Sequence, residues 1–128
     1  MTDVASAAPR TQTIATWALR AALAALFLFA AVMKLMGQPM MVQEFDAVGL
    51  GQWFRYFTGA LELVGGIALL IPSLSVLGAL VVLLVDIGAF FAQACVLHMD
   101  VVHTIVIAIA VGALLYLQRA QVRMLLGR

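Results

Sequence analysis

Long apolar stretches alternate with short polar segments along the chain. The apolar stretches are residues 14–36, 54–71, 74–97 and 101–117. A membrane-spanning helix needs about 20 mainly apolar residues, so each stretch is long enough to cross a bilayer. Pro72 leaves room only for a tight turn between the second and third stretches, which should therefore form an antiparallel hairpin. The pattern predicts an all-α fold, an integral membrane four-helix bundle over residues 14–118.

A mixed segment, residues 37–53, separates the first two stretches. Its apolar positions recur at roughly helical spacing, and polar residues fill the other side: Met41, Val42, Phe45 and Val48 against Gln43, Glu44 and Asp46. This pattern predicts a short amphipathic helix in the plane of the membrane interface. The aromatic residues Trp53, Phe54, Tyr56 and Phe57 are typical of the level at which a helix enters the bilayer.

Composition supports a membrane protein and excludes several function classes. Of the 128 residues, 66% are hydrophobic and 10% are charged, whereas about 25% are charged in a soluble domain. The chain has no basic run, so nucleic-acid binding is not expected. Cys95 is the single cysteine, which excludes an intramolecular disulfide, a CxxC pair and a thiolate metal cluster.

The two ends of the chain are polar. Residues 1–13 are predicted to be a disordered tail and residues 119–128 a basic tail with Arg119, Arg123 and Arg128. Lys and Arg in short loops are more frequent on the cytoplasmic side. We therefore expect a multi-pass protein with both termini in the cytoplasm.

Polar residues inside the apolar stretches form the candidate site. A charge at the centre of a membrane helix costs about 2.5–3.5 kcal/mol, so such residues face the bundle interior. Counted by depth along each helix, most of them lie in the outer half of the membrane. The sequence thus predicts a polar pocket that opens outward, with Glu62, Asp86 and Arg20 at its floor. The other candidates are Lys34, Gln93, His98 and His103.

Structural interpretations compete with functional ones at these positions. Arg20 paired with Glu62 or Asp86 would fix the helix register without any chemistry, and Lys34 is expected to extend its ammonium to the interface. For the two acids we favour function, because a single deep base leaves one carboxyl underpaired, as an acid/base catalyst needs. His98 and His103 are more typical of interfacial or proton-transfer residues than of metal ligands.

The order of motifs resembles a known family, the DoxX-like family of small four-helix membrane proteins. The shared features are a first-helix Arg and Lys, Phe-x-x-x-Gly-Leu, Gly-x-x-Glu-x-x-Gly and a Gly-Ala pair: Arg20, Lys34, Phe45 to Leu50, Gly59, Glu62, Gly65, Gly88 and Ala89. The resemblance covers roughly residues 18–111. It implies a bundle in the bacterial cytoplasmic (inner) membrane, association with redox or detoxification proteins, and a link to quinones. Asp86 and Gln93 depart from the family pattern.

Two functions from different classes follow. The first is an enzyme or binding protein for a small lipophilic molecule, with Glu62, Asp86 and His103 as acid/base groups. Arg20, Lys34, Gln93 and His98 would bind the ligand. Ring opening, isomerisation or cyclisation would suit these residues, since none needs a cofactor, a thiol or a metal; no cofactor is predicted, and a quinone stays open from the resemblance.

The second function is a non-catalytic membrane subunit that docks a partner protein through residues 37–53, with Arg20, Lys34 and Glu62 as structural pairs. A transporter-like role is a third alternative. One short bundle lacks the paired repeats of most transporters, but a homo-oligomer could supply them. A cavity that touches both Glu62 and Asp86 would favour the first function. A tightly packed interior in which Arg20 bridges both acids would favour the second.

Overall fold

The computed structural model describes residues 10–127, and their regular structure is entirely helical, which confirms the all-α prediction. The elements are α1 (Arg10–Leu35), α2 (Pro39–Val48), α3 (Gln52–Leu70), the 3-10 turn η2 (Pro72–Leu74), α4 (Ser75–Phe91), the π-helix η3 (Ala92–Leu97), α5 (Val102–Leu117) and α6 (Arg119–Leu125). α2 is bounded by glycines with left-handed φ angles, 74° at Gly37 and 86° at Gly49, which favour this residue.

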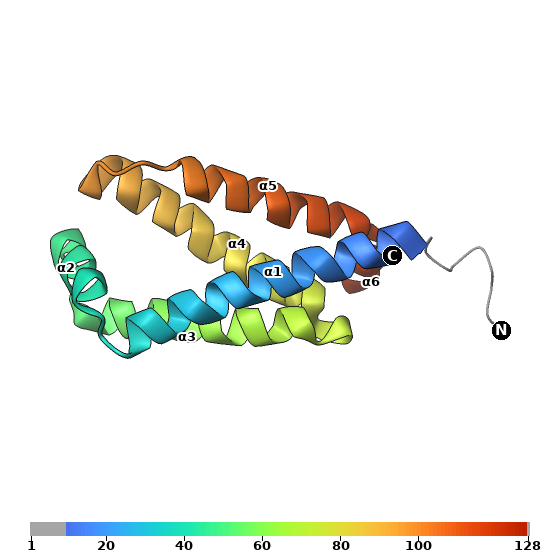
Figure 1. Ribbon diagram of the computed structural model, residues 1–128, viewed down its shortest axis with the longest axis horizontal. Helices are drawn as coiled ribbons and strands as arrows, with labels where there is room; N and C mark the ends of the chain where they lie inside the picture. Colours follow the sequence, from blue (N-terminus) through green and yellow to red (C-terminus); the bar gives the residue numbers. More distant parts are fainter. Residues whose placement is uncertain (1–9, 128) are drawn as a thin grey trace.

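The long helices α1, α3, α4 and α5 lie side by side (Figure 1). Each packs against two others, in the cyclic order α1, α3, α4, α5. α2 lies across one end of this group, where it contacts α3 and η3, and α6 lies at the opposite end (Figure 1). The molecule therefore has an α2 end and an α6 end, and these two names are used below.

The helix ends differ from the predicted ones at both tails. α1 begins at Arg10, so residues 10–13 of the predicted tail are helical, while residues 1–9 lie outside the described part of the chain. Residues 119–125 of the predicted basic tail form α6, which bends by 78° from α5. The predicted third helix is continuous from η2 to η3, but its winding changes from α to π at Ala92.

Two helical stretches in residues 10–127 are long and apolar enough to cross a membrane: Arg10–Leu35 and Pro72–Leu97. A third qualifies if α5 and the bent α6 are counted as one span. α3 does not qualify, although it has 19 residues. It contains the charged residues Arg55 and Glu62, and both are buried inside the group of helices.

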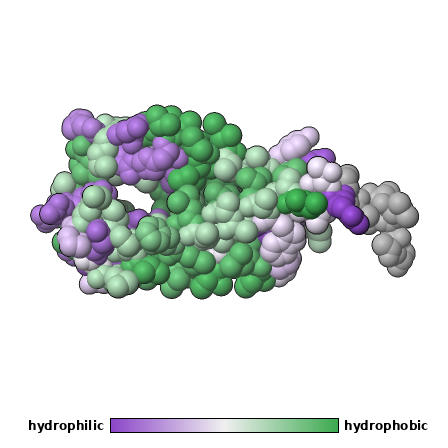
Figure 2. Space-filling model, in the orientation of Figure 1, coloured by the Kyte–Doolittle hydropathy of each residue, from purple (hydrophilic) through white to green (hydrophobic). Residues whose placement is uncertain are grey.

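The outer surface is consistent with contact to lipid. Large apolar side chains such as Phe29, Ile109 and Leu84 are mostly exposed on the long helices. Hydrophobic residues cover most of the face drawn in Figure 2, whereas hydrophilic residues gather toward the two ends. A monomeric soluble protein rarely exposes so much contiguous apolar surface. The helices are those of a membrane protein.

The apolar core lies from the middle of the molecule toward the α6 end. Its fully buried members come from all four long helices: Leu23, Ala24, Phe27, Leu69, Ala79, Val82, Val111 and Leu114. Glycines bring α3 and α4 together here. A Cβ added at Gly78 would lie 2.8 Å from the carbonyl oxygen of Gly65, so only glycine permits this approach.

Candidate functional site

A cavity of about 480 Å³ lies near the α2 end, between the long helices and beneath α2. Figure 2 shows the molecule hollowed at this end, with hydrophilic residues beside the hollow. Most of the lining is apolar, and its polar side chains are Lys34, Glu44, Thr58, Glu62, Gln93 and His103. Phe57 and Leu84 also line the cavity, yet they are 50% and 66% exposed. The cavity therefore reaches the apolar outer surface.

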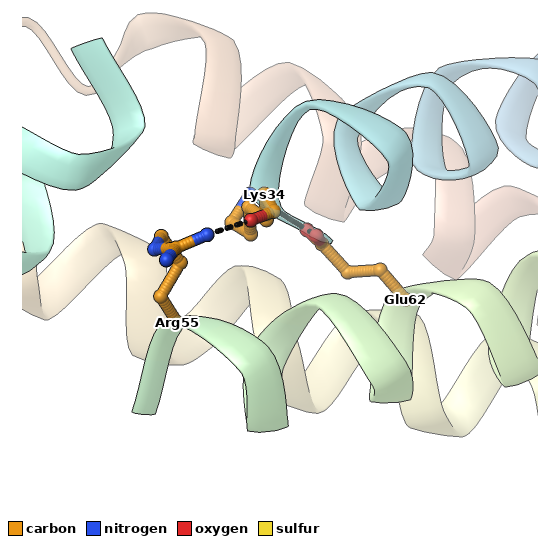
Figure 3. Close-up of polar contacts among 3 residues, drawn as sticks. All are labelled: Lys34, Arg55 and Glu62. Carbon is orange, nitrogen blue, oxygen red and sulfur yellow. Dashed lines mark hydrogen bonds and ion pairs between the residues drawn. The ribbon is translucent and has the colours of Figure 1, made fainter. Parts of the chain in front are cut away.

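A buried ion pair forms part of the cavity wall. The Nζ atom of Lys34 lies 3.0 Å from Oε1 of Glu62 and donates a hydrogen bond of 3.3 Å to Oε2. The two side chains are 15% and 5% exposed. Figure 3 shows Lys34 on α1 reaching toward Glu62 on α3. Of the two expectations for Lys34, the structure shows the pair with Glu62, which the flexible stem of the lysine allows.

Arg55 fixes the backbone that carries Lys34. From the first turn of α3, its Nη1 donates to the backbone carbonyl of Lys34 (Figure 3). Its Nε donates to Oε1 of Gln52 at 2.7 Å. The guanidinium also lies 4.3 Å from the ring centre of Tyr56. The last carbonyls of a helix have no donor within it, so Arg55 caps the end of α1 from a neighbouring helix. Sequence reasoning missed Arg55. Its charge stands among aromatic residues that face the membrane, and this indicated a buried side chain, because a charge exposed to lipid is costly.

Arg20 does not pair with an acid, contrary to the structural interpretation made from the sequence. Its Nε donates a 2.7 Å hydrogen bond to the carbonyl of Leu69, and its guanidinium lies 3.9 Å from the ring centre of Trp17. Leu69 is in the last turn of α3, where carbonyls lack helical donors. Arg20 thus caps α3 within the packed half and does not line the cavity. It bridges neither Glu62 nor Asp86.

Asp86 lies apart from Glu62, so the predicted shared floor is wrong. Asp86 lines a second cavity of about 430 Å³ between α4 and α5, beside Phe90 and Thr104. The α4 residues that line the first cavity, including Val85 and Ala89, lie on a neighbouring face of the helix. Depth along a helix gives only an axial position, and it does not determine the direction in which a side chain points.

Gln93 lines the first cavity, and its Oε1 is buried without a hydrogen-bond donor among residues 10–127. The sequence placed Gln93 on the same helix face as Asp86, seven residues earlier. The structure separates them, because Gln93 lies in the π-helix η3. A π-helix bonds residue i to i+5 and so has more residues per turn, which changes the angular spacing.

The two histidines have different positions. His103 in the first turn of α5 lines the cavity with Lys34 and Glu62. His98 ends η3 with a left-handed φ of 55°, is exposed and is not part of the lining. Nowhere in residues 10–127 do three His, Cys, Asp or Glu side chains come together as a metal site. The structure thus brings Lys34, Glu62, Gln93 and His103 together, and leaves Arg20, Asp86 and His98 outside.

Glu44 is a cavity residue that the sequence analysis placed on the polar side of its helix. It lines the cavity together with Met41, Phe45 and Val48, all from α2. The spacing carried a signal, because Glu44 is three residues after Met41 and four before Val48 and therefore lies on their face. No hydrogen bond or ion pair joins its carboxylate to another residue in the described part of the chain.

Comparison with known proteins gives a family. The model of the DoxX-like family matches residues 18–117, a range that contains every residue lining the cavity. No curated protein and no solved structure matches the chain. The resemblance inferred from the motifs is confirmed: the chain belongs to the DoxX-like family of membrane proteins.

Proposed function

We propose that this DoxX-like protein binds a small lipophilic molecule in the cavity beneath α2. The observation that carries the proposal is a buried ion pair, Lys34 with Glu62, on the wall of an otherwise mainly apolar cavity. A volume of about 480 Å³ falls within the range of about 300–1,000 Å³ that is usual for small-molecule sites. Apolar walls with a few fixed polar groups are typical of such sites.

The membrane arrangement is part of the proposal. The helices α1, α3, α4 and α5 form a four-helix bundle in the cytoplasmic membrane, with α2 in the interface plane. The start of α1 and the end of α6 lie at the same end of the molecule (Figure 1), which supports an even number of crossings. Arg119 and Arg123 at that end favour a cytoplasmic position for both termini.

A binding role has more support than acid/base catalysis by two carboxyl groups. Glu62 and Asp86 line different cavities, so they do not face one ligand as an acid and a base. Glu62 is ion-paired to Lys34, and the pair fixes the positions of these two side chains in the cavity wall. His103 is the remaining acid/base candidate beside the pair. We therefore propose a binding protein and assign no reaction to it.

Filling the cavity tests this function without removing a charge. Gly88 lines the cavity, and an added Cβ there meets no atom within 4 Å; the same is true of Gly112, which lies outside the cavity. Gly88→Leu should occupy ligand space, whereas Gly112→Leu is the matched control on α5. We would measure thermal stability in detergent with a panel of quinones, epoxides, alkenes and alcohols.

We expect at least one compound to raise the melting temperature of wild type and of Gly112→Leu, and to leave Gly88→Leu unshifted. Equal shifts in all three proteins would place binding outside the cavity and contradict the proposal. If no compound shifts wild type, the protein is better described as a non-catalytic subunit. A partner protein at residues 37–53 would then be sought by cross-linking.

A further inference from the structure

We propose that the cavity selects lipophilic amines, that is, molecules with one protonated amino group on a compact apolar body. This inference rests on the proposed function and specifies the ligand class for the same cavity. It is drawn from the balance of charges, from an unpartnered acceptor and from the arrangement of aromatic rings along the wall.

The lining carries an excess negative charge. Its titratable side chains are Lys34, Glu44, Glu62 and His103. Lys34 is neutralised by Glu62 at 3.0 Å. With histidine counted as neutral, Glu44 adds a carboxylate that no cation in the described part of the chain balances. A cationic ligand would supply the missing charge, whereas an anionic ligand would meet an uncompensated carboxylate and a lysine that is already paired.

A buried acceptor points to the same class. Oε1 of Gln93 lies in the cavity wall without a donor from residues 10–127. A buried acceptor without a partner costs about 1–3 kcal/mol. An ammonium has three donors and no acceptor, so it can donate to this amide oxygen once the Gln93 side chain turns its Oε1 into the cavity. Donors of this kind form the stronger, charge-assisted hydrogen bonds.

Aromatic rings line the wall beside Glu44. Phe45 follows Glu44 directly on α2 and lies 5.8 Å from Phe54, which lies 6.3 Å from Phe57, measured between ring centres. All three line the cavity. Ring faces attract cations when the cation lies within about 6 Å. An ammonium near Glu44 would therefore be held between a carboxylate and a cluster of phenyl rings, while an apolar body fills the rest.

Matched probes separate charge from shape. 1-Adamantylmethylamine and 1-adamantanemethanol have the same hydrocarbon body and differ in one polar group, protonated in the amine at neutral pH. We would titrate each into the full-length protein in phosphatidylcholine nanodiscs by calorimetry, with empty nanodiscs as the blank. The variants are Glu44→Gln and Asp46→Asn. Asp46 is an exposed acid of the same helix outside the cavity, so it controls for the change in net charge.

We expect wild type and Asp46→Asn to bind the amine about tenfold more tightly than the alcohol, the effect of one charge-assisted hydrogen bond. In Glu44→Gln this preference should largely disappear while alcohol binding is retained. Equal affinities for both probes in wild type would overturn the inference and leave the proposed function standing. An equal loss in Asp46→Asn would also overturn it, as a surface-charge effect. Binding of neither probe would contradict both proposals.

Discussion

The two ends of the molecule are built on different principles. At the α6 end, side chains such as Leu69, Val76 and Leu114 are fully buried, and Gly65 and Gly78 bring two backbones into contact. At the α2 end, α2 and η3 have no buried residue, and α4 presents Gly88, where an added Cβ would meet open space. One end is a close-packed scaffold, and the other encloses a mainly apolar cavity with a few polar groups in its wall.

The comparison shows how a short chain divides into a close-packed half and a half that encloses a cavity. Dense packing at the α6 end provides the contacts that hold the helices together. The α2 end is less densely packed, and its helices are held by polar contacts, from Lys34 to Glu62 and from Arg55 to the end of α1. The following substitutions test this division, beginning with the largest expected effect.

Removing the cation of the buried pair should have the largest effect. Lys34→Met leaves Glu62 as a buried carboxylate without its partner, which should lower the free energy of unfolding by about 3 kcal/mol. The double variant Lys34→Met/Glu62→Leu should recover most of this loss, because neither member of the pair is then left as an unpaired buried charge. SDS titration in mixed micelles measures both. A double variant no more stable than Lys34→Met would show that the pair does not act as a unit.

At the packed end, Gly78→Ala should lower the free energy of unfolding by about 2 kcal/mol. The new Cβ would lie 2.8 Å from the carbonyl oxygen of Gly65 and 2.8 Å from the amide nitrogen of Leu69. Both are backbone atoms, so α3 and α4 would have to separate. The same titration checks the value, and an unchanged stability would mean that this interface is looser than its geometry indicates.

Arg55→Gln should lower the free energy of unfolding by about 1–2 kcal/mol, because the Lys34 carbonyl loses a buried donor. It should also speed hydrogen exchange of the amides of α2, which follows that carbonyl. Arg119→Gln is the matched control: Arg119 also donates to a backbone carbonyl and lies 4.4 Å from the ring centre of Tyr116, but it is exposed. Equal effects of the two substitutions would argue against a capping role for Arg55.

The smallest effect should have the opposite sign. Gly88→Ala lies on the same helix as Gly78, yet its Cβ meets open space. Alanine restricts the unfolded chain more than glycine, so the variant should be more stable by about 0.5–1 kcal/mol. Gly112→Ala should behave alike for the same reason. A destabilised Gly88→Ala would mean that the α2 end closes further than the structure shows.

Sequence reasoning predicted the helical fold and the burial of Glu62, because apolar length and the cost of a carboxylate in hydrocarbon are local properties. It considered both Lys34 and Arg20 as partners of the acids, and only Lys34 pairs with one of them. Lys34 and Arg20 were assigned by depth along separate helices, whereas their contacts depend on how far one helix is shifted and rotated against the next. Asp86 was misplaced for the same reason, since it needed a direction as well as a position. Glu44 was overlooked although its spacing from Met41 and Val48 gave its direction. The π-winding of residues 92–97 was also not predicted.

Phe57 and Leu84 border the cavity and are also exposed on the apolar outer surface. A ligand that enters beside them arrives from the bilayer, where lipophilic molecules dissolve at far higher concentration than in water. The quantity that sets occupancy is then the mole fraction of ligand in lipid. Apparent dissociation constants stated in aqueous units should rise in proportion to added lipid, so affinities measured at different lipid-to-protein ratios become comparable only after correction for partitioning.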